Sequence, residues 1–452
     1  MDILTLFACC SPFVSTTSLG QLAVIAEAIF SMTGRVTMLG ISRWAEKRGS
    51  YRNIQRFFAT TFLWTALHLK FVESHLFNPS HEYILAGDAT TVTKSGKETF
   101  GIDRFFSGIL GKVVKGLEFF VISLIDVTAR KSYPLAVKQT IREKAEKEEA
   151  PKRKKEVKKK KRKNAKKKPS NLKGRPPGVL NKDKMKLELS SELLRIHELL
   201  KAVLKLLRVF VMVKYVAMDG HYGHNQAVLM ARENGLELIT KLRKDGILYE
   251  KYEGEYSGRG ARKKKGERLN LDAIPRKYWQ KEVREKELVT NYYAGIFRHP
   301  SFGMELKVVI IEKKNEKKKQ IGHVILISSD INLSWDKIVE YYSLRFQIEF
   351  NFRDAKQHFG LEDFMNTSER GVENAVNLSF LMVNVSAKLL AQKGESCVGI
   401  NDLKSQYRGA KYAGWIIKKV LKIAEPIKIN QMIEEAGRLG SIHQAKVATS
   451  SP

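Results

Sequence analysis

The stretch RVFVMVKYVAMDGHYGHNQAVLMARENGLELITKL, Arg208 to Leu242, decides the fold class of this chain. Residues 209–218 form a run of apolar and β-branched side chains that is typical of a buried strand. Residues 224–235 then place apolar side chains at helical spacing, and residues 236–242 predict a second, short strand. A strand, a helix and a strand in this order predict an α/β unit with a partly parallel sheet.

Strand patterns lie on both sides of this unit. Before it, YILAGDATTV (83–92) and GLEFFVISLIDV (116–127) predict buried strands. After it, residues 246–322 mix strand-like runs with basic turns, which we interpret as a β-rich insertion with cationic loops; an ordinary solvated surface is the alternative. HVILISSD (323–330) predicts a returning strand, followed by a long helix that opens near Asn332.

Composition and charge narrow the possible partners. The 452 residues carry a formal net charge of +32, and 43% are hydrophobic, which is enough for a sizeable core in two or three domains. Such a charge predicts a polyanionic partner, nucleic acid before an anionic membrane. We expect a soluble intracellular protein with no membrane partner, because no run of 18 apolar residues and no signal-peptide pattern occurs. The cysteines Cys9, Cys10 and Cys397 form no CxxC pair, so we expect reduced thiols.

The basic residues are concentrated in one segment. Residues 151–175 contain 15 Lys or Arg and one Glu, so this segment alone supplies +14 of the net charge. A run of this kind builds no core and predicts a disordered, solvated arm. Its end, KGRPPG, carries Lys173 and Arg175 around a Gly-Arg-Pro core and resembles an AT-hook, which binds the minor groove of A·T-rich DNA. Simple phosphate neutralisation by a basic tail is an equal alternative.

The N-terminal residues predict helices. Residues 18–77 carry apolar side chains at spacings of 3 to 4, with basic residues and aromatics added in the second half. A small helical domain with a basic face favours DNA binding. An ordinary helical packing domain stays open as the alternative, because no sharp helix-turn-helix signature is present.

Four different functional groups recur in YYSLRFQIEFNFRDAK (341–356). They are Tyr342, Arg345, Glu349 and Lys356, at spacings of 3, 4 and 7. On a single α-helix these four side chains fall within an arc of about 60°. Apolar residues flank the stripe on both sides, with Phe346 and Phe350 on one side and Tyr341, Leu344, Ile348 and Phe352 on the other. A run of surface ion pairs is the plain alternative. The flanks instead favour the polar floor of a cleft that binds a charged substrate.

Two aspartates complete a set of three carboxylates. Asp88 ends the predicted strand YILAGD, and Asp219 directly follows the strand at 209–218. Both are expected at carboxyl ends of strands, where α/β sheets place their sites. Each Asp taken alone is more often a turn or helix-cap residue. Together with Glu349, however, they could hold two Mg²⁺ ions about 3.5 to 4 Å apart and act on a phosphodiester.

The spacing Tyr342-x2-Arg345-x3-Glu349-x6-Lys356 is similar to the YREK signature of the insertion-sequence-four group of bacterial DDE transposases. GDATTVTKSGK (87–97) resembles the first-Asp region of that group, and residues 219–245 resemble its second, with Asp219-x2-Tyr222 in register. The resemblance covers about residues 80–370. It departs from the group at residues 142–186, a basic insertion that lengthens the spacing between the two aspartates.

This resemblance implies an α/β fold in which an RNase H-like catalytic core is interrupted by a β-rich insertion, with helical N- and C-terminal regions. The expected divisions are a helical DNA-binding region (1–79), a first core segment (80–141), the basic arm (142–190), a second core segment (191–245), the β-rich insertion (246–322), a third core segment with the Glu helix (323–395) and a helical C-terminal region (396–452).

The resemblance also implies roles for individual residues. Asp88, Asp219 and Glu349 would be the catalytic triad that binds two metal ions, Mg²⁺ with Mn²⁺ as a substitute. Tyr342, Arg345 and Lys356 would hold phosphates at the transposon end. Tyr222 and His221 would shape the site, although a local hydrogen-bonding role is the safer interpretation of His221.

The implied activity is cut-and-paste DNA transposition in the bacterial cytoplasm, at the nucleoid. The partners would be the terminal repeats of the element, target DNA and a second copy of the chain in the end-paired complex. Two alternatives stay open: a non-catalytic, domesticated DNA-binding protein of the same fold, and a metal-dependent nuclease without strand transfer.

Overall fold

The computed structural model describes most of the chain, and the predicted basic arm falls largely outside the described residues. These are 3–45, 49–108, 110–142, 183–256, 258, 263–318, 320–394, 399–417, 430 and 433–434. The AT-hook-like KGRPPG, with Lys173 and Arg175, therefore lies outside the described residues. So does most of the C-terminal region beyond residue 417.

The N-terminal residues form a run of short helices, as their apolar periodicity predicts. These are α1 (Ile3–Phe7), the 3₁₀ helix η1 (Ala8–Phe13), α2 (Thr16–Ser31), α3 (Met38–Trp44), α4 (Tyr51–Ala59) and α5 (Trp64–His75). Hydroxyl side chains define where three of them begin, because Ser15, Thr37 and Ser50 each accept a backbone N–H from the first turn of α2, α3 and α4.

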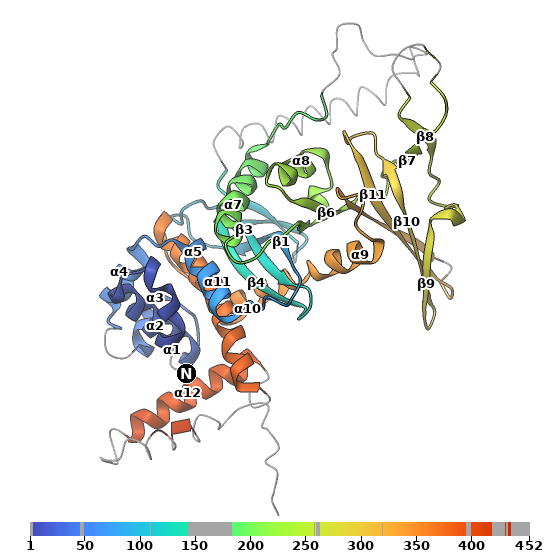
Figure 1. Ribbon diagram of the computed structural model, residues 1–452. Helices are drawn as coiled ribbons and strands as arrows, with labels where there is room; N and C mark the ends of the chain where they lie inside the picture. Colours follow the sequence, from blue (N-terminus) through green and yellow to red (C-terminus); the bar gives the residue numbers. More distant parts are fainter. Residues whose placement is uncertain are drawn as a thin grey trace, which may run out of the picture.

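Twelve described strands form one mixed sheet. They are β1 (Tyr83–Thr93), β2 (Asp103–Ser107), β3 (Lys112–Asp126), β4 (Lys131–Gln139), β5 (Tyr215–Met218), β6 (Glu237–Leu242), β7 (Tyr249–Lys251), β8 (Lys265–Arg268), β9 (Trp279–Glu285), β10 (Leu288–Arg298), β11 (Glu305–Asn315) and β12 (Gln320–Ser328). Their order is β2-β3-β1-β5-β6-β12-β11-β10-β7-β8, with β4 paired to β3 and β9 to β10 (Figure 1). The pairs β1–β5 and β5–β6 are parallel, and the remaining pairs are antiparallel. The partly parallel α/β sheet is thus confirmed.

Two predicted strand ends are wrong. The run at 209–218 contributes only Tyr215–Met218 to the sheet. The residues before it form backbone turns directly after a helix that ends at Leu207, and Val209 and Met212 are 80% and 78% exposed. The strand YILAGD was expected to end at Asp88, but β1 continues to Thr93, close to the end of the longer predicted run 83–92. Its antiparallel pairing with β3 extends beyond the point where its parallel pairing with β5 ends.

Helices cover both faces of the part of the sheet around β1, β3, β4, β5 and β6, whereas β7 to β10 extend beyond these helices (Figure 1). The helices are α7 (Ser191–Leu207), α8 (Asn225–Glu233), α9 (Trp335–Leu344), α10 (Gln347–His358), α11 (Glu369–Lys393) and α12 (Ile400–Ile416). Alternate residues of β1 belong to two hydrophobic clusters: Ile84 and Ala86 pack with α9, α10 and α11, whereas Tyr83 and Leu85 pack with α7 and α8. This alternation is what a strand buried on both faces requires.

The long helix α11 belongs to the protein core. It is the one helix among the described residues that is long and apolar enough to cross a membrane, but most of that stretch is buried inside the protein. Its polar residues hold other elements in place: Asn384 donates a hydrogen bond to the Pro134 carbonyl at 2.8 Å, and Asn374 accepts one from the Trp64 indole at 2.7 Å. The length and the apolar composition of α11 are therefore explained by its packing inside the protein core.

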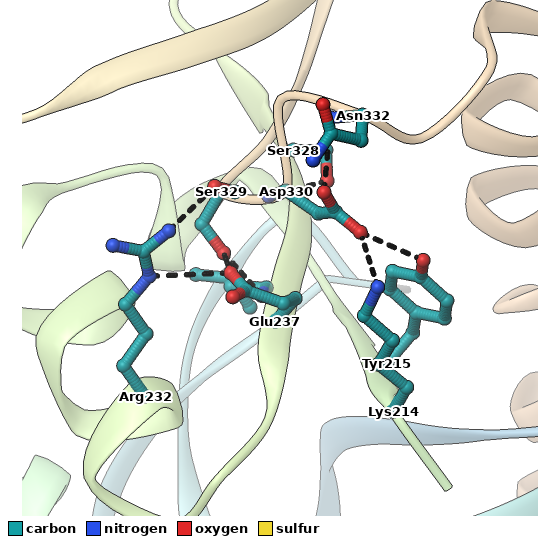
Figure 2. A network of polar contacts seen from close by, with 9 residues as sticks. Lys214, Tyr215, Arg232, Glu237, Ser328, Ser329, Asp330 and Asn332 are labelled. Carbon is teal, nitrogen blue, oxygen red and sulfur yellow. Dashed lines mark hydrogen bonds and ion pairs between the residues drawn. The ribbon is translucent and has the colours of Figure 1, made fainter.

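A polar network fixes the chain where β12 returns to the parallel strands (Figure 2). The Asp330 carboxylate accepts hydrogen bonds from Lys214 Nζ at 2.7 Å and from the Tyr215 hydroxyl at 2.9 Å. Arg232 donates to the Ser329 carbonyl at 2.7 Å and to Glu237 at 3.2 Å. These contacts lie at the amino-terminal ends of β5 and β6. They anchor the segment that leads into α9 and thereby help to place α10 on the sheet.

Candidate active site

Asp88 and Asp219 occupy equivalent positions on neighbouring strands. The parallel register of β1 and β5 pairs Leu85 with Val216 and ends at Gly87 with Met218. Asp88 and Asp219 are the next residues on the two strands. Since paired strands lie about 4.8 Å apart, both carboxylates leave the sheet from the same edge. The prediction that Asp88 ends its strand is wrong, because Asp88 lies within the long strand β1. It lies directly after the point where the parallel pairing with β5 stops.

Asp88 is largely buried and already has a cationic partner. Its side chain is 20% exposed, and the Arg345 guanidinium donates a hydrogen bond to Oδ2. The backbone N–H of Ala89 donates to Oδ1 at 2.8 Å. Burial raises the pKa of Asp88, and the negative charge of Asp219 adds to that effect, while Arg345 and the Ala89 N–H oppose it. The net result is a carboxylate whose charge is costly to keep.

Glu349 lies in the first turn of α10 and shares the field of both aspartates. Loss of water raises its pKa first, and the charges of Asp88 and Asp219 raise it further, while Arg345 lowers it. The side chain remains exposed. The charge of Asp219 thus reaches Asp88, and the charges of both aspartates reach Glu349.

The donor chemistry of this unit fits a hard divalent cation. Carboxylate oxygens are the ligands that Mg²⁺ and Mn²⁺ prefer, and a cation would offset the loss of water, and the smaller repulsion from neighbouring carboxylates, that raise the pKa of Asp88 and Glu349. Among the described residues no group of three or more His, Cys, Asp or Glu is gathered closely enough to hold a metal ion. Arg345 provides the compensating positive charge at Asp88 instead.

The predicted single helix over 342–356 is wrong. The chain forms two helices, α9 and α10, with a tight turn at Arg345 and Phe346 between them. The N–H groups of Phe346, Ile348 and Glu349 each donate to the carbonyl three residues earlier, at 3.2, 3.1 and 3.0 Å, as in a 3₁₀ helix. Both turn residues keep right-handed helical φ and ψ angles, which any residue type can adopt. The break therefore needs no proline or glycine, and the sequence gives no sign of it.

Tyr342 and Arg345 remain side by side across this break. The Arg345 guanidinium carbon lies 5.6 Å from the centre of the Tyr342 ring, a cation–π distance. Burial raises the pKa of Tyr342, Arg345 lowers it, and Asp219 raises it. Arg345 is 9% exposed, and its Nε has no hydrogen-bond partner among the residues that the structure describes. The guanidinium therefore retains a donor that an anionic ligand could use.

The apolar flanks of the stripe differ from the prediction. Tyr341, Leu344, Ile348 and Phe352 are buried in the core, as expected. On the other flank, Phe346 and Phe350 are 49% and 38% exposed, with their ring centres 5.7 Å apart. The reason is that α10 lies on the surface with one side against the sheet and α11. The stripe is the border between core and solvent, open on one side, and not the floor of an enclosed cleft.

Lys356 is engaged by the protein itself. Its Nζ donates to the Thr91 carbonyl of β1 at 2.8 Å and lies 3.6 Å from Glu362. The side chain is 12% exposed, and burial lowers the pKa of the ammonium group. These contacts hold α10 against β1. The predicted phosphate contact of Lys356 remains a prediction.

His221 and Tyr222 both bind an acid that the sequence did not reveal. They belong to the 3₁₀ turn η2 (Gly220–Tyr222) that follows Asp219. The Tyr222 hydroxyl donates to Glu192 Oε1 at 3.0 Å, and His221 Nε2 lies 3.2 Å from the same oxygen. The hydrogen bond between His221 and Glu192 is the largest cause of both pKa shifts: it lowers the pKa of Glu192 and raises the pKa of His221. Glu192 is far away in the sequence, and its place in the first turn of α7 signals only a helix start.

A cavity of about 240 Å³ opens beside these residues, on the side of the sheet covered by α7. Ala89, Glu118 and Tyr222 are among its lining residues. Ala89 directly follows Asp88, and Tyr222 lies three residues after Asp219, so the cavity adjoins the same edge of the sheet. His221 and Tyr222 therefore border the candidate site from the side of α7, whereas Arg345 and Glu349 border it from the opposite side.

A family model described as DDE superfamily endonuclease matches residues 9–291. The matched range contains Asp88 and Asp219 and ends before α9 and Glu349. No curated protein sequence matches the chain.

Proposed function

Because the chain belongs to the DDE superfamily endonucleases, we propose that it is a DDE transposase of a bacterial-type insertion sequence. It cuts DNA at the ends of its own element and joins the freed 3′-hydroxyl to target DNA. The observation that carries this proposal is the placement of Asp88 and Asp219 at equivalent positions on adjacent parallel strands, with Glu349 in the field of both. Three carboxylates without a divalent cation would only repel a DNA backbone.

The proposed fold is an RNase H-like core built on β1, β3, β5 and β6, with α10 carrying the third acid. The strands between residues 246 and 322 would be a β-rich insertion in that core. The parallel neighbours β1 and β5 supply the two aspartates, and β6 follows as the third parallel strand. The helical N-terminal region and the basic arm would bind DNA outside the catalytic core.

Asp88, Asp219 and Glu349 would hold two divalent cations, Mg²⁺ with Mn²⁺ as a substitute. Bound divalent cations in such sites lower the pKa of an attacking water or hydroxyl and stabilise the leaving oxygen of a phosphodiester. The contribution of the chain is to keep three acids ionised at one edge of a rigid sheet. Burial of Asp88 on β1 makes that charge costly in the free protein and so favours a cationic ligand.

Arg345 links charge balance to substrate binding. In the structure it neutralises Asp88, and its Nε is a buried donor with no partner among the described residues. A guanidinium released from Asp88 would remain held over the Tyr342 ring, beside the three acids. From there it can bind two oxygens of a phosphate, which a lysine cannot do with the same geometry. We therefore assign Arg345 and Tyr342 to binding of the scissile phosphate. Lys356 would contact a phosphate of the same DNA end from the same helix face.

The remaining elements of the proposal concern assembly and place of action. Two copies of the chain would pair the two ends of the element, each end carrying its terminal repeat. The protein would act in the cytoplasm, at the nucleoid. Lys173 and Arg175 of the basic arm would contact the minor groove or the phosphates of the bound DNA.

A metal-independent DNA-binding role is the second candidate. It is favoured by one observation, the Arg345–Asp88 contact, which neutralises the first acid without any metal. A protein that only binds DNA would keep this contact permanently. A catalytic protein must exchange it for a cation.

The test is a cleavage assay on linear DNA that carries both ends of the element, in Mg²⁺ and in Mn²⁺. Asp88→Asn, Asp219→Asn and Glu349→Gln should each abolish cleavage and strand transfer while binding to the ends is retained. Asp354→Asn is the matched control, because Asp354 lies on α10 but pairs with the exposed Arg353 at 2.9 Å. Normal cleavage by any of the three variants would disprove the triad. End binding without cleavage by the wild type would favour the second candidate.

A further inference from the structure

We propose that α4 is the helix that reads duplex DNA, by inserting its outer face into the major groove; the proposal rests on DNA being the substrate. The helix spans Tyr51–Ala59 in the N-terminal region. It contributes no residue to the candidate active site, and its sequence carries no familiar motif. Its two faces, its charge and its attachment to α11 point to this role.

The helix has a fully buried face and a fully exposed one. Ile54, Phe57 and Phe58 are 2%, 0% and 5% exposed and join the core. Tyr51, Arg52, Gln55 and Arg56 are all exposed. At 100° per residue these four span about 140° of the helix circumference, an arc that also contains the small exposed side chain of Ala59.

The charge of the exposed face matches a polyanion. Arg43 in the last turn of α3 and Arg52 and Arg56 on α4 are at the surface, and neither helix contains an Asp or Glu. None of the three arginines forms an ion pair with a residue that the structure describes. Arginines that are not neutralised within the protein are available to phosphates, and each phosphate contact releases counterions from DNA.

The side chains on this face are those that distinguish base pairs. In the major groove an arginine can bind O6 and N7 of guanine, and a glutamine can bind N6 and N7 of adenine. Arg52, Gln55 and Arg56 stand within little more than one turn of a short helix, which the groove accommodates. The Tyr51 hydroxyl, at the first helical position, suits a phosphate contact that sets the register.

A buried asparagine fixes α4 to the helix that follows the catalytic segment. Asn374 of α11 donates to the carbonyls of Phe58 and Thr60 at 2.9 and 2.8 Å, and accepts from the Trp64 indole at 2.7 Å. Asn374 is 1% exposed, so these bonds are shielded from water. The C-terminal end of α4 is thereby held rigidly on the core. We expect the base pairs that α4 reads to lie at a fixed distance from the cut.

The experiment is a selection of bound sequences from a library of random duplex DNA, with the full-length chain, without divalent cations and at physiological salt. The wild type should select a short motif. Gln55→Ala should lose the preference at one base pair and bind the wild-type motif about 10- to 100-fold more weakly. The double variant R52A/R56A should lose the motif. The control K201A/K205A removes two exposed charges at the same spacing from α7 and should keep the motif.

Three results would overturn the proposal. The wild type could select no motif, Gln55→Ala could select the wild-type motif with unchanged affinity, or R52A/R56A could weaken selected and scrambled duplexes equally. The last result would show that the arginines of α4 contact only DNA phosphates and do not read the base sequence. Because the selection measures binding alone, these results differ from a failure of the proposed cleavage. Circular dichroism of each variant checks that the exposed substitutions leave the fold intact.

Discussion

Replacing Arg345 with alanine tests whether this arginine compensates for a missing cation at Asp88. The two side chains are 10% and 20% exposed, and the guanidinium donates directly to the carboxylate. Removing one partner of a fully buried ion pair costs about 3 to 5 kcal/mol. Asp88 retains some contact with water and can take up a proton, so we expect the free energy of unfolding to fall by about 2 to 3 kcal/mol at neutral pH.

The pH dependence of this loss has a defined sign. The pKa of Asp88 is already raised above its ordinary value of 3.8, so the folded state binds more protons than the unfolded state above that pH. Stability contributed by the protonated group is therefore present at low pH and is lost as the pH rises through the raised pKa. Arg345 lowers the pKa of Asp88, and its removal must raise that pKa further. The variant should therefore lose more stability than the wild type as the pH rises from acidic to neutral.

The assay is thermal unfolding of both proteins over this pH range, with and without Mg²⁺. A loss of about 2 to 3 kcal/mol should lower Tm by roughly 2 to 3 °C, because the entropy of unfolding is about 2.1 cal/mol/K per residue and the chain has 452 residues. Mg²⁺ should stabilise the variant more than the wild type, because it meets no competing guanidinium at Asp88. Arg353→Ala is the matched control: its side chain is 52% exposed beside Asp354, and its removal should cost less than about 1 kcal/mol. Equal pH and Mg²⁺ responses in wild type and R345A would refute the reasoning.

Two further predictions concern other regions of the chain. A hydrogen bond from Cys10, with a smaller contribution from His75, lowers the pKa of Cys9 to about 5. The rate of alkylation of Cys9 by iodoacetamide should therefore become constant above about pH 6, whereas the rate for an unperturbed thiol would keep rising up to about pH 9. Mass spectrometry of the labelled peptide measures this rate, with Cys9→Ser as the control. Deleting residues 151–178 removes the charge of the basic arm and should flatten the salt dependence of DNA binding, by a slope of about 0.9 for each phosphate that the arm no longer neutralises, while Tm stays unchanged. An unchanged slope would show that the arm does not touch DNA.

The sequence could predict those features that depend on local periodicity. The strand, helix and strand at 208–242 identify the parallel pair that places Asp219 at the edge of the sheet, because burial on both faces requires a continuous apolar run. Asp88 was predicted at the end of its strand, whereas it lies inside β1, one residue beyond the last parallel pair with β5. How far β1 continues is decided by its antiparallel partner β3, and such pairing is not encoded within the strand itself.

Long-range contacts explain what the sequence could not show. Glu192 reaches His221 and Tyr222 only because α7 packs over the end of β5, and no spacing in the sequence indicates this. The exposed face of α4 is visible in the sequence as an amphipathic pattern. Only the structure, however, shows that this face points away from the core, because Asn374 and the buried aromatic residues contact the opposite side of α4.

The tight turn at Arg345 and Phe346 changes how the side chains of the polar stripe are arranged around the helix axis. On an ideal helix Arg345 and Glu349 are four residues apart and would form an ion pair. In the described structure Arg345 pairs with Asp88 and not with Glu349. A turn with 3₁₀ bonds rotates each residue by about 120° and not about 100°, which moves Glu349 further around the axis from Arg345. The break therefore leaves the Glu349 carboxylate without an ion pair to Arg345, whose charge still lowers the pKa of Glu349, and within reach of the charges of Asp88 and Asp219. A carboxylate that is not held in an ion pair is available to the divalent cation that we propose.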